Sequence, residues 1–404
     1  MESRLPKPLW QLLGVQSADE PVQPITTTAR YTLLRGDNLD GLPRLACARP
    51  LFDVCYIDPP YNTGSSFLYD DHRKQRSPAV FGSNEPWMRF MLPRLHWGAL
   101  CLQDAGIMMV SIDDYAMAHL KLMLDDVFGE DNHLGTIAVR RSKNGKSAKK
   151  GVATGHEYVL VYRKSVQGKI FPLPDLSEYP KEDAYGRYRI DGLFRKKGDA
   201  SLRTDRPNLF YPLYACLNTG SVSVEPKGGS VQIFPRDSRG TERRWIWSKE
   251  TAAARSHCLY SSPNGVVYVK NYQSGQGAGK ISSWWDNPAY YTERGTVELK
   301  AVFGEKIFET PKPIAFIKQL LSIAGSKQAR ILDFFAGSGT TAIAAHQLNQ
   351  ADGGDRSVVL MESNTKVPPS SKAFQQGFQT ISDITLARLL GSGLEPHRVD
   401  DWQL

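Results

Sequence analysis

The chain has 404 residues, of which 50 are Lys or Arg and 42 are Asp or Glu, so its formal net charge is +8 and its isoelectric point is near 9.1. This length is enough for a full α/β core and a second, smaller domain, and the positive charge favours a polyanionic partner. Five widely spaced cysteines without a Cys-x-x-Cys pair argue against a disulfide framework or a zinc site, and the lack of a signal-like N-terminus or a bilayer-spanning apolar run favours a cytoplasmic protein with no membrane partner.

The first predicted elements lead to a short motif. Residues 1–28 are rich in Pro and Gln and are predicted to form an N-terminal arm, and Tyr31–Leu34 is expected to open the core. The apolar run Phe52–Ile57 predicts a buried strand, and the tetrapeptide Asp58–Tyr61, Asp-Pro-Pro-Tyr, follows it directly. Two consecutive prolines cannot continue a sheet ladder or enter a helix. They hold the chain rigid just beyond the carboxyl end of a strand, where open α/β sheets bind their ligands.

This tetrapeptide places a carboxylate and an aromatic ring beside the rigid corner of Pro59 and Pro60. The pair suits a flat heterocycle with an exocyclic amino group: its ring would stack on Tyr61, while Asp58 and the Pro59 carbonyl accept the N–H hydrogens. The lone pair of an aromatic amine is delocalised into its ring, so the nitrogen is a poor nucleophile until both N–H bonds are drawn to acceptors. Asp58 is therefore interpreted as a polarising acceptor rather than a base, and all four residues are predicted to be catalytic. A plain strand terminator is the alternative for a Pro-Pro corner considered alone.

The next elements are predicted to alternate between helix and strand. Residues 64–86 are polar and punctuated by Gly, Pro and Ser, which predicts a long loop beside the motif. The spacing of apolar residues predicts helices over 87–102 and 115–128, with a buried strand at Gly106–Ile112 between them.

A basic run then lies between residues 140 and 150, directly before a predicted strand at Glu157–Tyr162. Lys and Arg along a flexible loop can neutralise several phosphates without selecting a sequence, so the run is predicted to track a nucleic-acid backbone, although many such runs are only solvated loops. Residues 165–290 are rich in Tyr, Trp, Gly and charge and are interpreted as a recognition region inserted in the sheet core. The six cations of the run are Arg140, Arg141, Lys143, Lys146, Lys149 and Lys150.

A second motif, at residues 329–345, predicts a strand, a glycine turn and a helix that opens at Thr340 or Thr341. Gly337 and Gly339 allow the backbone of the turn to approach a ligand closely. The predicted helices over 316–323 and 381–390 lie on either side of this motif in the sequence.

Two acids frame the glycine turn. Asp333 ends the strand before it, and Glu362 ends the next strand, where an acidic residue of a nucleotide-binding βαβ unit takes ribose hydroxyls. The motif lacks the third glycine of the dinucleotide pattern and the lysine of a phosphate loop. It therefore fits a ligand with a ribose and positive charge, and S-adenosylmethionine is such a ligand.

Together these motifs make the sequence resemble the amino-methylating DNA methyltransferases of the β order, in which the catalytic motif precedes the cofactor motif, and especially the modification subunits of type III restriction systems. The resemblance implies that Asp37 contacts the adenine end of S-adenosylmethionine, that Lys312 and Pro313 lie beside its methionine end, and that the glycine turn and Glu362 line the pocket. The turn residues so implied are Asp333, Phe335, Ala336, Gly337, Ser338, Gly339 and Thr340. The matching segments are Arg35–Asn38, Tyr56–Gly64, Thr296–Lys300, Pro311–Pro313 and Phe334–Thr341.

The resemblance also implies the fold, a doubly wound, Rossmann-like α/β sheet of the S-adenosylmethionine-dependent methyltransferases with an inserted target-recognition domain. The expected order is an N-terminal arm (1–28), the catalytic half of the core (29–136), the insert (137–295) and the cofactor-binding half with a C-terminal helix (296–404).

The predicted activity is site-specific transfer of a methyl group from S-adenosylmethionine to N6 of an adenine, which must be flipped out because its amine is hidden in duplex DNA. Three alternatives stay open: methylation of cytosine N4, for which the family more often has Ser in place of Asp58; methylation of RNA or a protein amide; and a DNA-bound regulator with a degenerate pocket. No metal is expected, since His156-Glu157 lacks a second His four residues on. The partners expected are double-stranded DNA, a second copy of the chain and a separate restriction subunit, in the nucleoid-associated cytoplasm of a bacterium or in a phage-infected cell.

Overall fold

A computed structural model describes residues 9, 13, 23–25, 27–48, 51–62, 82–143, 151–172, 179–273 and 281–400 of the chain. The chain divides into two compact units, Met1–Leu173 with Lys280–Leu404, and Pro174–Gly279. In the described ranges, no helix is long and apolar enough to cross a membrane, and no group of three or more His, Cys, Asp or Glu side chains is arranged to hold a metal ion.

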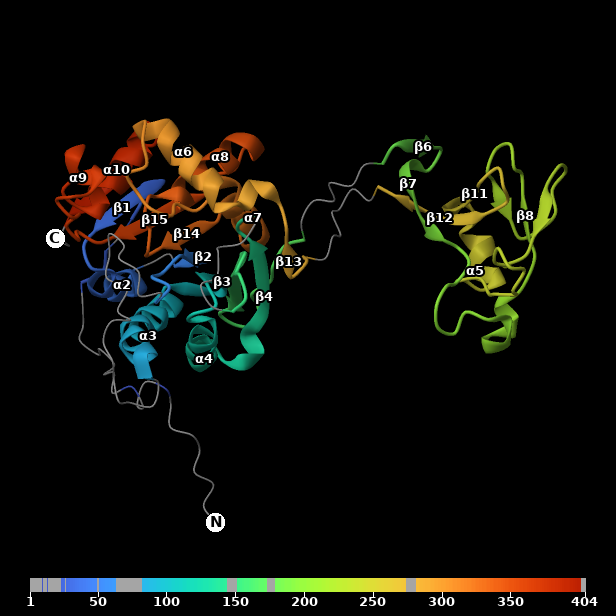
Figure 1. The fold of residues 1–404 in the computed structure, drawn as a ribbon, viewed down its shortest axis with the longest axis horizontal. Helices are drawn as coiled ribbons and strands as arrows, with labels where there is room; N and C mark the ends of the chain where they lie inside the picture. The colour runs from blue at the N-terminus through green and yellow to red at the C-terminus, as the bar shows by residue number, and fades with distance from the viewer. Residues whose placement is uncertain are drawn as a thin grey trace, which may run out of the picture. The chain divides into compact units, whose positions relative to one another are not determined.

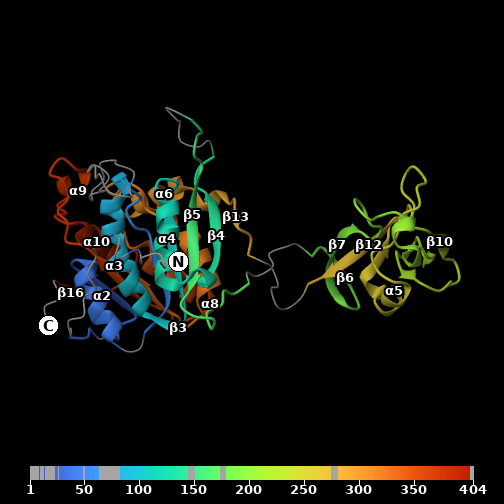
Figure 2. The same ribbon diagram turned by 90° about the horizontal axis from the view of Figure 1, so that it is seen from below.

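The first unit is built on a nine-stranded sheet with helices on both faces (Figures 1 and 2). In spatial order its strands are β13 (Trp284–Trp285), β4 (His133–Arg140), β5 (His156–Arg163), β3 (Leu102–Ile112), β2 (Phe52–Ile57), β14 (Arg330–Asp333), β15 (Ser357–Glu362), β1 (Tyr31–Arg35) and β16 (His397–Asp400). Strand β5 runs antiparallel to both of its neighbours, β3 and β4, and the other neighbouring pairs are parallel. The predicted doubly wound α/β fold is confirmed.

The strands divide their side chains between two cores, because successive residues of a strand point to opposite faces. In β2, Cys55 and Ile57 enter one core, and Val54 and Tyr56 enter the other. The first core is covered by α2 (Asn38–Cys47), α3 (Glu85–Leu100) and α4 (Met117–Phe128), and the second by α7 (Ile314–Ala324) and α8 (Thr340–Asp352). The remaining helices of this unit are α6 (Thr292–Phe303), α9 (Lys372–Gln375) and α10 (Ile381–Gly391).

The helices predicted from apolar spacing are confirmed, with small shifts at their ends. The helix expected from residue 87 begins at Glu85, because Pro86 fits the first turn, where its missing N–H has no helical partner. The helix expected near Thr340 begins at that residue, directly after the glycine turn. Beyond the predicted C-terminal helix, β16 adds a parallel edge strand to β1.

The second unit is organised around a small aromatic core. The rings of Phe194 and Trp245 stack with their centroids 5.2 Å apart, and Leu213 and Leu259 are buried in the same cluster. One antiparallel sheet has the strand order β11 (Leu259–Ser261), β12 (Val267–Tyr272), β7 (Gly186–Leu193) and β6 (Lys181–Asp183). A second antiparallel sheet has the order β10 (Val231–Ile233), β8 (Leu213–Ala215) and β9 (Val222–Ser223). The described part of this unit also contains the α-helix α5 (Lys249–Ala254).

The predicted insert, residues 137–295, is too wide at both ends. Strands β4 and β5 precede the second unit in the sequence, and β13 and α6 follow it, yet all four belong to the first unit. Val159 and Val161 of β5 are buried in the second core of the main sheet, and β13 pairs with β4. The charge and polarity of a segment do not show which unit it belongs to. A strand joins the sheet whose strands, often distant in the sequence, hydrogen-bond to its backbone.

The predicted N-terminal arm does not hold for the described residues of that segment. Leu13 is fully buried in the first core, and Ile25 is buried there too. The Ile25 N–H donates to the Arg44 carbonyl oxygen at 3.3 Å. Leu9 and Leu13 are four positions apart, a helical spacing that was the available signal in this Pro- and Gln-rich stretch and was not used.

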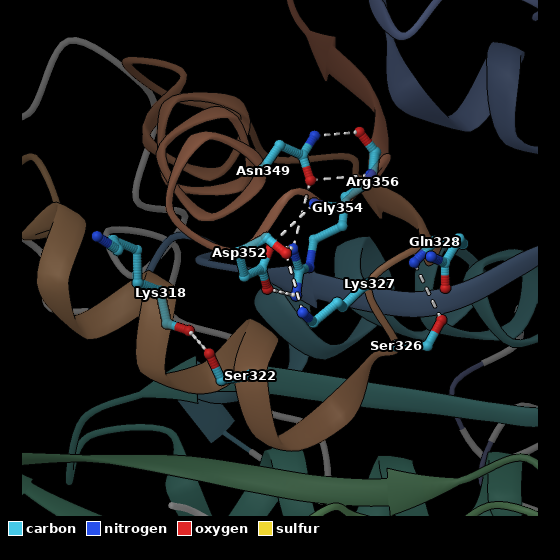
Figure 3. Close-up of polar contacts among 9 residues, drawn as sticks. All are labelled: Lys318, Ser322, Ser326, Lys327, Gln328, Asn349, Asp352, Gly354 and Arg356. Atoms are coloured by element: carbon cyan, nitrogen blue, oxygen red, sulfur yellow. Dashed lines mark hydrogen bonds and ion pairs between the residues drawn. The ribbon is translucent and has the colours of Figure 1, made fainter.

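A polar network around Arg356 lies at the amino ends of β14 and β15 (Figure 3). The Arg356 guanidinium donates to both carboxylate oxygens of Asp352 at 3.0 and 2.9 Å, and the Asn349 side chain bonds the Arg356 backbone N–H and carbonyl, each at 2.9 Å. Lys327 Nζ donates to the Asp352 carbonyl at 2.9 Å. The network ties the end of α8 to the strands, at the edge opposite their carboxyl ends.

Candidate active site

The carboxyl ends of β1, β2, β14 and β15 open onto one cavity of about 300 Å³. This edge of a doubly wound sheet is where ligands bind. The cavity brings the Asp-Pro-Pro-Tyr corner and the glycine turn together, although they lie at opposite ends of the sequence. The predicted site residues in its wall are Asp37, Asp58, Pro60, Lys312, Asp333, Phe335, Ala336, Gly337, Ser338, Thr340 and Glu362, whereas Pro59, Tyr61, Pro313 and Gly339 are not part of the wall.

The glycine turn needs glycine at two positions. Gly337 has φ +52° and Gly339 has φ +79°, values that residues with a Cβ atom rarely adopt. A Cβ at Gly339 would lie 3.1 Å from Leu389 Cδ2, and one at Gly337 would lie 3.4 Å from the Phe308 ring. Both positions therefore favour glycine through their positive φ, and at Gly339 a side chain would also be crowded by Leu389.

The acids that frame the turn are held by hydrogen bonds. Asp333 accepts from the Phe335 N–H at 3.1 Å and from the Thr341 hydroxyl at 2.5 Å. Glu362 accepts from the Gly337 N–H at 2.6 Å, which links the end of β15 to the turn. Burial raises the pKa of both carboxyl groups to about 7. A cationic ligand in the cavity would favour their ionised forms.

Side chains of helix α10 hydrogen-bond to the glycine turn, a contact that the sequence did not predict. The Thr385 hydroxyl donates to the Gly337 carbonyl at 2.5 Å. The buried Arg388 guanidinium donates to the Ser338 hydroxyl at 2.5 Å and to the Thr340 hydroxyl at 2.8 Å. The predicted terminal helix is thus a support for the cofactor motif.

A buried arginine of α3 organises the other end of the cavity. Arg94 is 6% exposed and donates to Asp37 at 2.8 Å and to the Asn38 side chain at 2.5 Å. Asn38 in turn donates to the Phe334 carbonyl at 2.6 Å, so the start of α2 is tied to the end of β14. An arginine on the buried side of a predicted apolar helix was the available signal, and it was not used.

The Asp-Pro-Pro-Tyr corner contains a cation in addition to the predicted acid and ring. The Tyr61 hydroxyl donates to Asp58 Oδ1 at 2.7 Å, and Lys312 Nζ lies 2.7 Å from both that oxygen and the Tyr61 hydroxyl oxygen. Burial and the neighbouring carboxylates raise the pKa of Tyr61 well above its usual range, so its hydroxyl keeps its proton. The Trp87 indole N–H donates to the Pro60 carbonyl at 2.7 Å and holds the corner in place.

Glu157, Arg141 and Asp113 add three charged groups to this site, and sequence reasoning predicted no role for Glu157 or Asp113. Glu157, on β5, is 4% exposed, and its Oε2 lies 3.5 Å from Lys312 Nζ and 3.7 Å from the Arg141 guanidinium. Burial lowers the pKa of Arg141, but Glu157, Tyr61, Asp58 and Asp113 together outweigh this, and the net pKa is raised. Asp113, at the end of β3, has a pKa raised to about 6 by burial.

The described cations of the basic run have different surroundings, and Lys143 is exposed. Arg141 lies beside the active-site acids, and Arg140 pairs with Asp286 at 3.1 Å and donates to the Lys143 carbonyl at 2.8 Å. The remaining cations of the run, Lys146, Lys149 and Lys150, lie outside the described residues.

The two motifs that share this cavity also lie within the sequence pattern of a known protein family. The sequence model of the DNA methylase family that comprises N6 and N4 methyltransferases matches residues 52–366 of the chain. The chain belongs to the N6-adenine/N4-cytosine DNA methyltransferases. The family that the sequence motifs predicted is therefore confirmed.

Its relatives include a type II methyltransferase and Mod subunits of type III enzymes. This methyltransferase is 51% identical to the type II methyltransferase M.KpnI of Klebsiella pneumoniae over 370 residues, which are 91% of this chain and 88% of M.KpnI. It is 32% identical to the type III StyLTI Mod subunit of Salmonella typhimurium and 30% identical to the EcoPI Mod subunit of Escherichia phage P1. These matches cover 88% of this chain in both cases but 56% and 61% of the two Mod subunits.

Solved structures of DNA methyltransferases resemble the methyltransferase at low identity. The M1.HpyAVI–SAM complex has a TM-score of 0.40 at 12% identity, with coverage of 89% of this chain and 98% of M1.HpyAVI. The cytosine-N4-specific PvuII DNA methyltransferase has a TM-score of 0.43 at 13% identity, with coverage of 93% and 97%.

Proposed function

We propose that this methyltransferase transfers a methyl group from S-adenosylmethionine to the N6 amino group of an adenine in double-stranded DNA. The observation that supports this most strongly is the shared cavity: Asp58 of the catalytic corner and Glu362 beside the glycine turn line the same 300 Å³ space. An amine bound at Asp58 and a methyl donor bound beside Glu362 would lie in the same cavity with a fixed orientation toward each other. Such positioning supplies much of the rate when both reactants are bound.

The residues of the cavity fit S-adenosylmethionine. Asp37, Asp333 and Glu362 line it, and the turn carries no lysine that would select a phosphate. Acids of this kind suit the ribose hydroxyls and the positive charges of the cofactor. When bound, the cofactor supplies an electrophilic methyl group on its sulfonium.

The catalytic corner would act on the amine. Asp58 accepts one N–H of the base and so draws the nitrogen toward a tetrahedral shape, and among the described residues no donor occupies the Pro59 carbonyl, which can accept the other. As the nitrogen lone pair bonds the methyl carbon, the bond from that carbon to sulfur would break with its electron pair left on the sulfur, and positive charge grows on nitrogen beside the Asp58 carboxylate, which stabilises it. The nitrogen then releases a proton to that carboxylate and on to water.

Adenine is preferred to cytosine because residue 58 is Asp, whereas N4-cytosine members of the resembled family more often have Ser there. The family itself includes both chemistries. The target amine is buried in the duplex, and flipping the base out costs about a few kcal/mol. Stacking on Tyr61 and hydrogen bonds to Asp58 would offset part of that cost.

The second unit is proposed to recognise the target sequence. Its 106 residues, 174–279, hold 16 Lys and Arg against 11 Asp and Glu, which is most of the net charge of the chain. Within it, Arg236 and Glu242 pair as a β-bridge and form a narrow hairpin. Asp237 Oδ1 accepts from the Arg239 and Thr241 N–H groups, both at 3.0 Å, so the turn is rigid.

Arg239 stands at the tip of this hairpin. It is exposed, and none of the described residues pairs with its side chain. The major groove of B-DNA admits a two-stranded ribbon, and arginine commonly reads guanine there through two hydrogen bonds. We assign Arg239 to base recognition on this ground.

Changing Arg239 to alanine should relax the methylation motif at one guanine. Discrimination at that base pair should fall by about 1 to 3 kcal/mol, the contribution of a bidentate arginine–guanine pair. Base-resolution methylation sequencing would show newly methylated sites that differ at one position. The matched control is Lys197→Ala, an exposed cation of the same unit, which should lower affinity for all sequences alike. An unchanged motif in the Arg239 variant would contradict the assignment.

The partners beyond DNA are also proposals. The Mod subunits named above are parts of type III restriction-modification enzymes, which favours a separate restriction subunit for this chain. A homodimer in the cytoplasm fits the resemblance to β-order enzymes. Light scattering with and without target duplex tests the dimer, and a monomer that is active at nanomolar concentration would contradict it.

The proposed function is tested by expressing the chain alone in cells without methylation of their own. Nucleoside analysis of the DNA should show N6-methyladenine, and methylation-sensitive sequencing should locate it in one motif. N4-methylcytosine instead would establish the cytosine alternative. Absence of both products, with the cofactor bound, would favour a binding-only regulator.

Cofactor affinity should depend on pH through Asp333 and Glu362. Their pKa values of about 7 mean that both groups are mostly protonated at pH 6, and a cationic ligand favours the ionised forms. Binding at pH 6 must therefore release protons and should be weaker than at pH 7.5, with a slope of up to about one log unit of affinity per pH unit for each group. Calorimetry in two buffers of different ionisation enthalpy measures the release. Equal affinity and no proton release at pH 6 would contradict the expectation, and Glu362→Gln should remove one of the two contributions.

A further inference from the structure

One oxygen of the carboxylate that should receive the target amine already accepts two hydrogen bonds. Asp58 Oδ1 accepts from the Tyr61 hydroxyl and from Lys312 Nζ, each at 2.7 Å. A charged ammonium is a stronger donor than a neutral aromatic amine. An ammonium on this carboxylate also offsets the negative charge that polarises the amine, so Asp58 acts on the amine in full only when Lys312 moves away from it.

Lys312 has a second carboxylate within reach. Its Nζ lies 3.5 Å from Glu157 Oε2, and its ammonium lies 5.0 Å from the centroid of the Tyr61 ring. The side chains of Lys312 and Glu157 are only 12% and 6% exposed. A shift of about 0.5 to 1 Å would bring the ammonium to hydrogen-bond distance from Glu157. Because both groups are buried, neither can exchange its partner for bulk water.

Glu157 is itself prepared to receive this cation. Arg141 lies 3.7 Å away on the β4 side and keeps the buried carboxylate paired while Lys312 is on Asp58. The Tyr61 hydroxyl, 3.4 Å from Glu157 Oε2, links the two acids. The carboxylates of Asp58 and Glu157 thus share the cations of Lys312 and Arg141, and Asp113 interacts with Arg141 as well.

We propose that Glu157 is a positioning residue that takes the Lys312 ammonium from Asp58 when the target amine binds. The transfer frees Asp58 to accept the amine N–H and moves a positive charge away from the nitrogen, which itself becomes positive during methyl transfer. Like charges a few ångströms apart oppose each other strongly in a site shielded from water. Glu157 therefore acts on both the binding of the base and the rate of transfer. This inference rests on the proposed function, because it concerns the same amine and the same carboxylate.

The test compares Glu157→Gln, Lys312→Met and the double variant, all with the target duplex found by sequencing. Glutamine keeps the size of Glu157 and removes the charge that attracts Lys312, so KM for DNA should rise and kcat should fall, with kcat/KM lower by about 100-fold. If Glu157 acts through Lys312, the double variant should be no worse than Lys312→Met alone, because residues that act as a unit are not additive. Glu157→Asp, which restores the charge, should recover part of the activity.

Two outcomes would overturn the inference. Losses that multiply in the double variant would show that Glu157 acts independently of Lys312, and near-normal kinetics of Glu157→Gln would show that it has no part in positioning. A cofactor affinity that falls in Lys312→Met but not in Glu157→Gln would place Lys312 on the cofactor instead, and would likewise overturn it. Thermal unfolding of each variant identifies a loss that is only structural. Failure of the unmodified chain to methylate either base would count against the proposed function, a result distinct from all of these.

Discussion

Replacing Asp58 with alanine should abolish methyl transfer, with a loss of about 10³-fold or more, while the affinity for S-adenosylmethionine changes little. Alanine offers no acceptor for the amine and no negative charge beside the nitrogen in the transition state. Asp58 lies at the end of β2, whereas the cofactor motif lies at the ends of β14 and β15, so the cofactor site keeps its own hydrogen bonds.

Single-turnover assays and calorimetry measure the two properties separately for this variant. Asp58→Asn is the matched control, because it keeps the size and one acceptor oxygen but removes the charge. It should retain more activity than alanine. Near-normal turnover of Asp58→Ala would contradict the catalytic role, and a parallel loss of cofactor affinity would show that Asp58 serves the cofactor.

Replacing Gly337 with valine should do the reverse and abolish cofactor binding. The backbone there has φ +52°, which costs a residue with a Cβ roughly 1 to 2 kcal/mol, and a branched one more. A Cβ at this position would also contact the Phe308 ring at 3.4 Å, and Gly337 lines the cavity, so a branched side chain adds bulk at the cavity wall. The Gly337 N–H that bonds Glu362 would shift with the turn.

Gly353→Val is the matched control for this change. Gly353 caps α8 with a similar φ of +67°, but no atom lies within 4 Å of the position a Cβ would take, and it is not part of the cavity. Both variants should lose a similar amount of stability in thermal unfolding. Only Gly337→Val should lose the calorimetric signal of S-adenosylmethionine. Equal cofactor binding by the two variants would show that the turn is not the cofactor site.

The two motifs were predictable because each is local. Asp58–Tyr61 combines a buried strand with two prolines, and the glycine turn combines a strand, two glycines and a helix start, so short-range steric rules decide both shapes. The order of helices and strands followed from apolar spacing for the same reason. The family resemblance rests on these segments and is confirmed by the match over residues 52–366.

The contacts around those motifs were not predictable in the same way. Lys312 was expected beside the cofactor, yet its ammonium lies on Asp58, 254 positions away in the sequence. Glu157 and Arg94 are charged residues within apolar elements. The residues next to them in the sequence do not show which side chain each one pairs with. Such pairs form because burial makes an unpaired charge costly, and the partner is whichever opposite charge the fold brings near.

The sequence by itself determined the sheet-forming and helix-forming segments, the rigid corner and the positive-φ turn, because backbone sterics and the period of apolar residues act over a few neighbouring positions. Only the tertiary structure decided that β5 and β13 belong to the main sheet, that Leu13 is buried in its core, and that Glu157, Lys312 and Arg141 surround Asp58. These features depend on strand order and on pairing between distant segments. The free energy of burying a charge or an apolar side chain depends on the distant segments that cover it and pair with it, so a local pattern of residues cannot predict it.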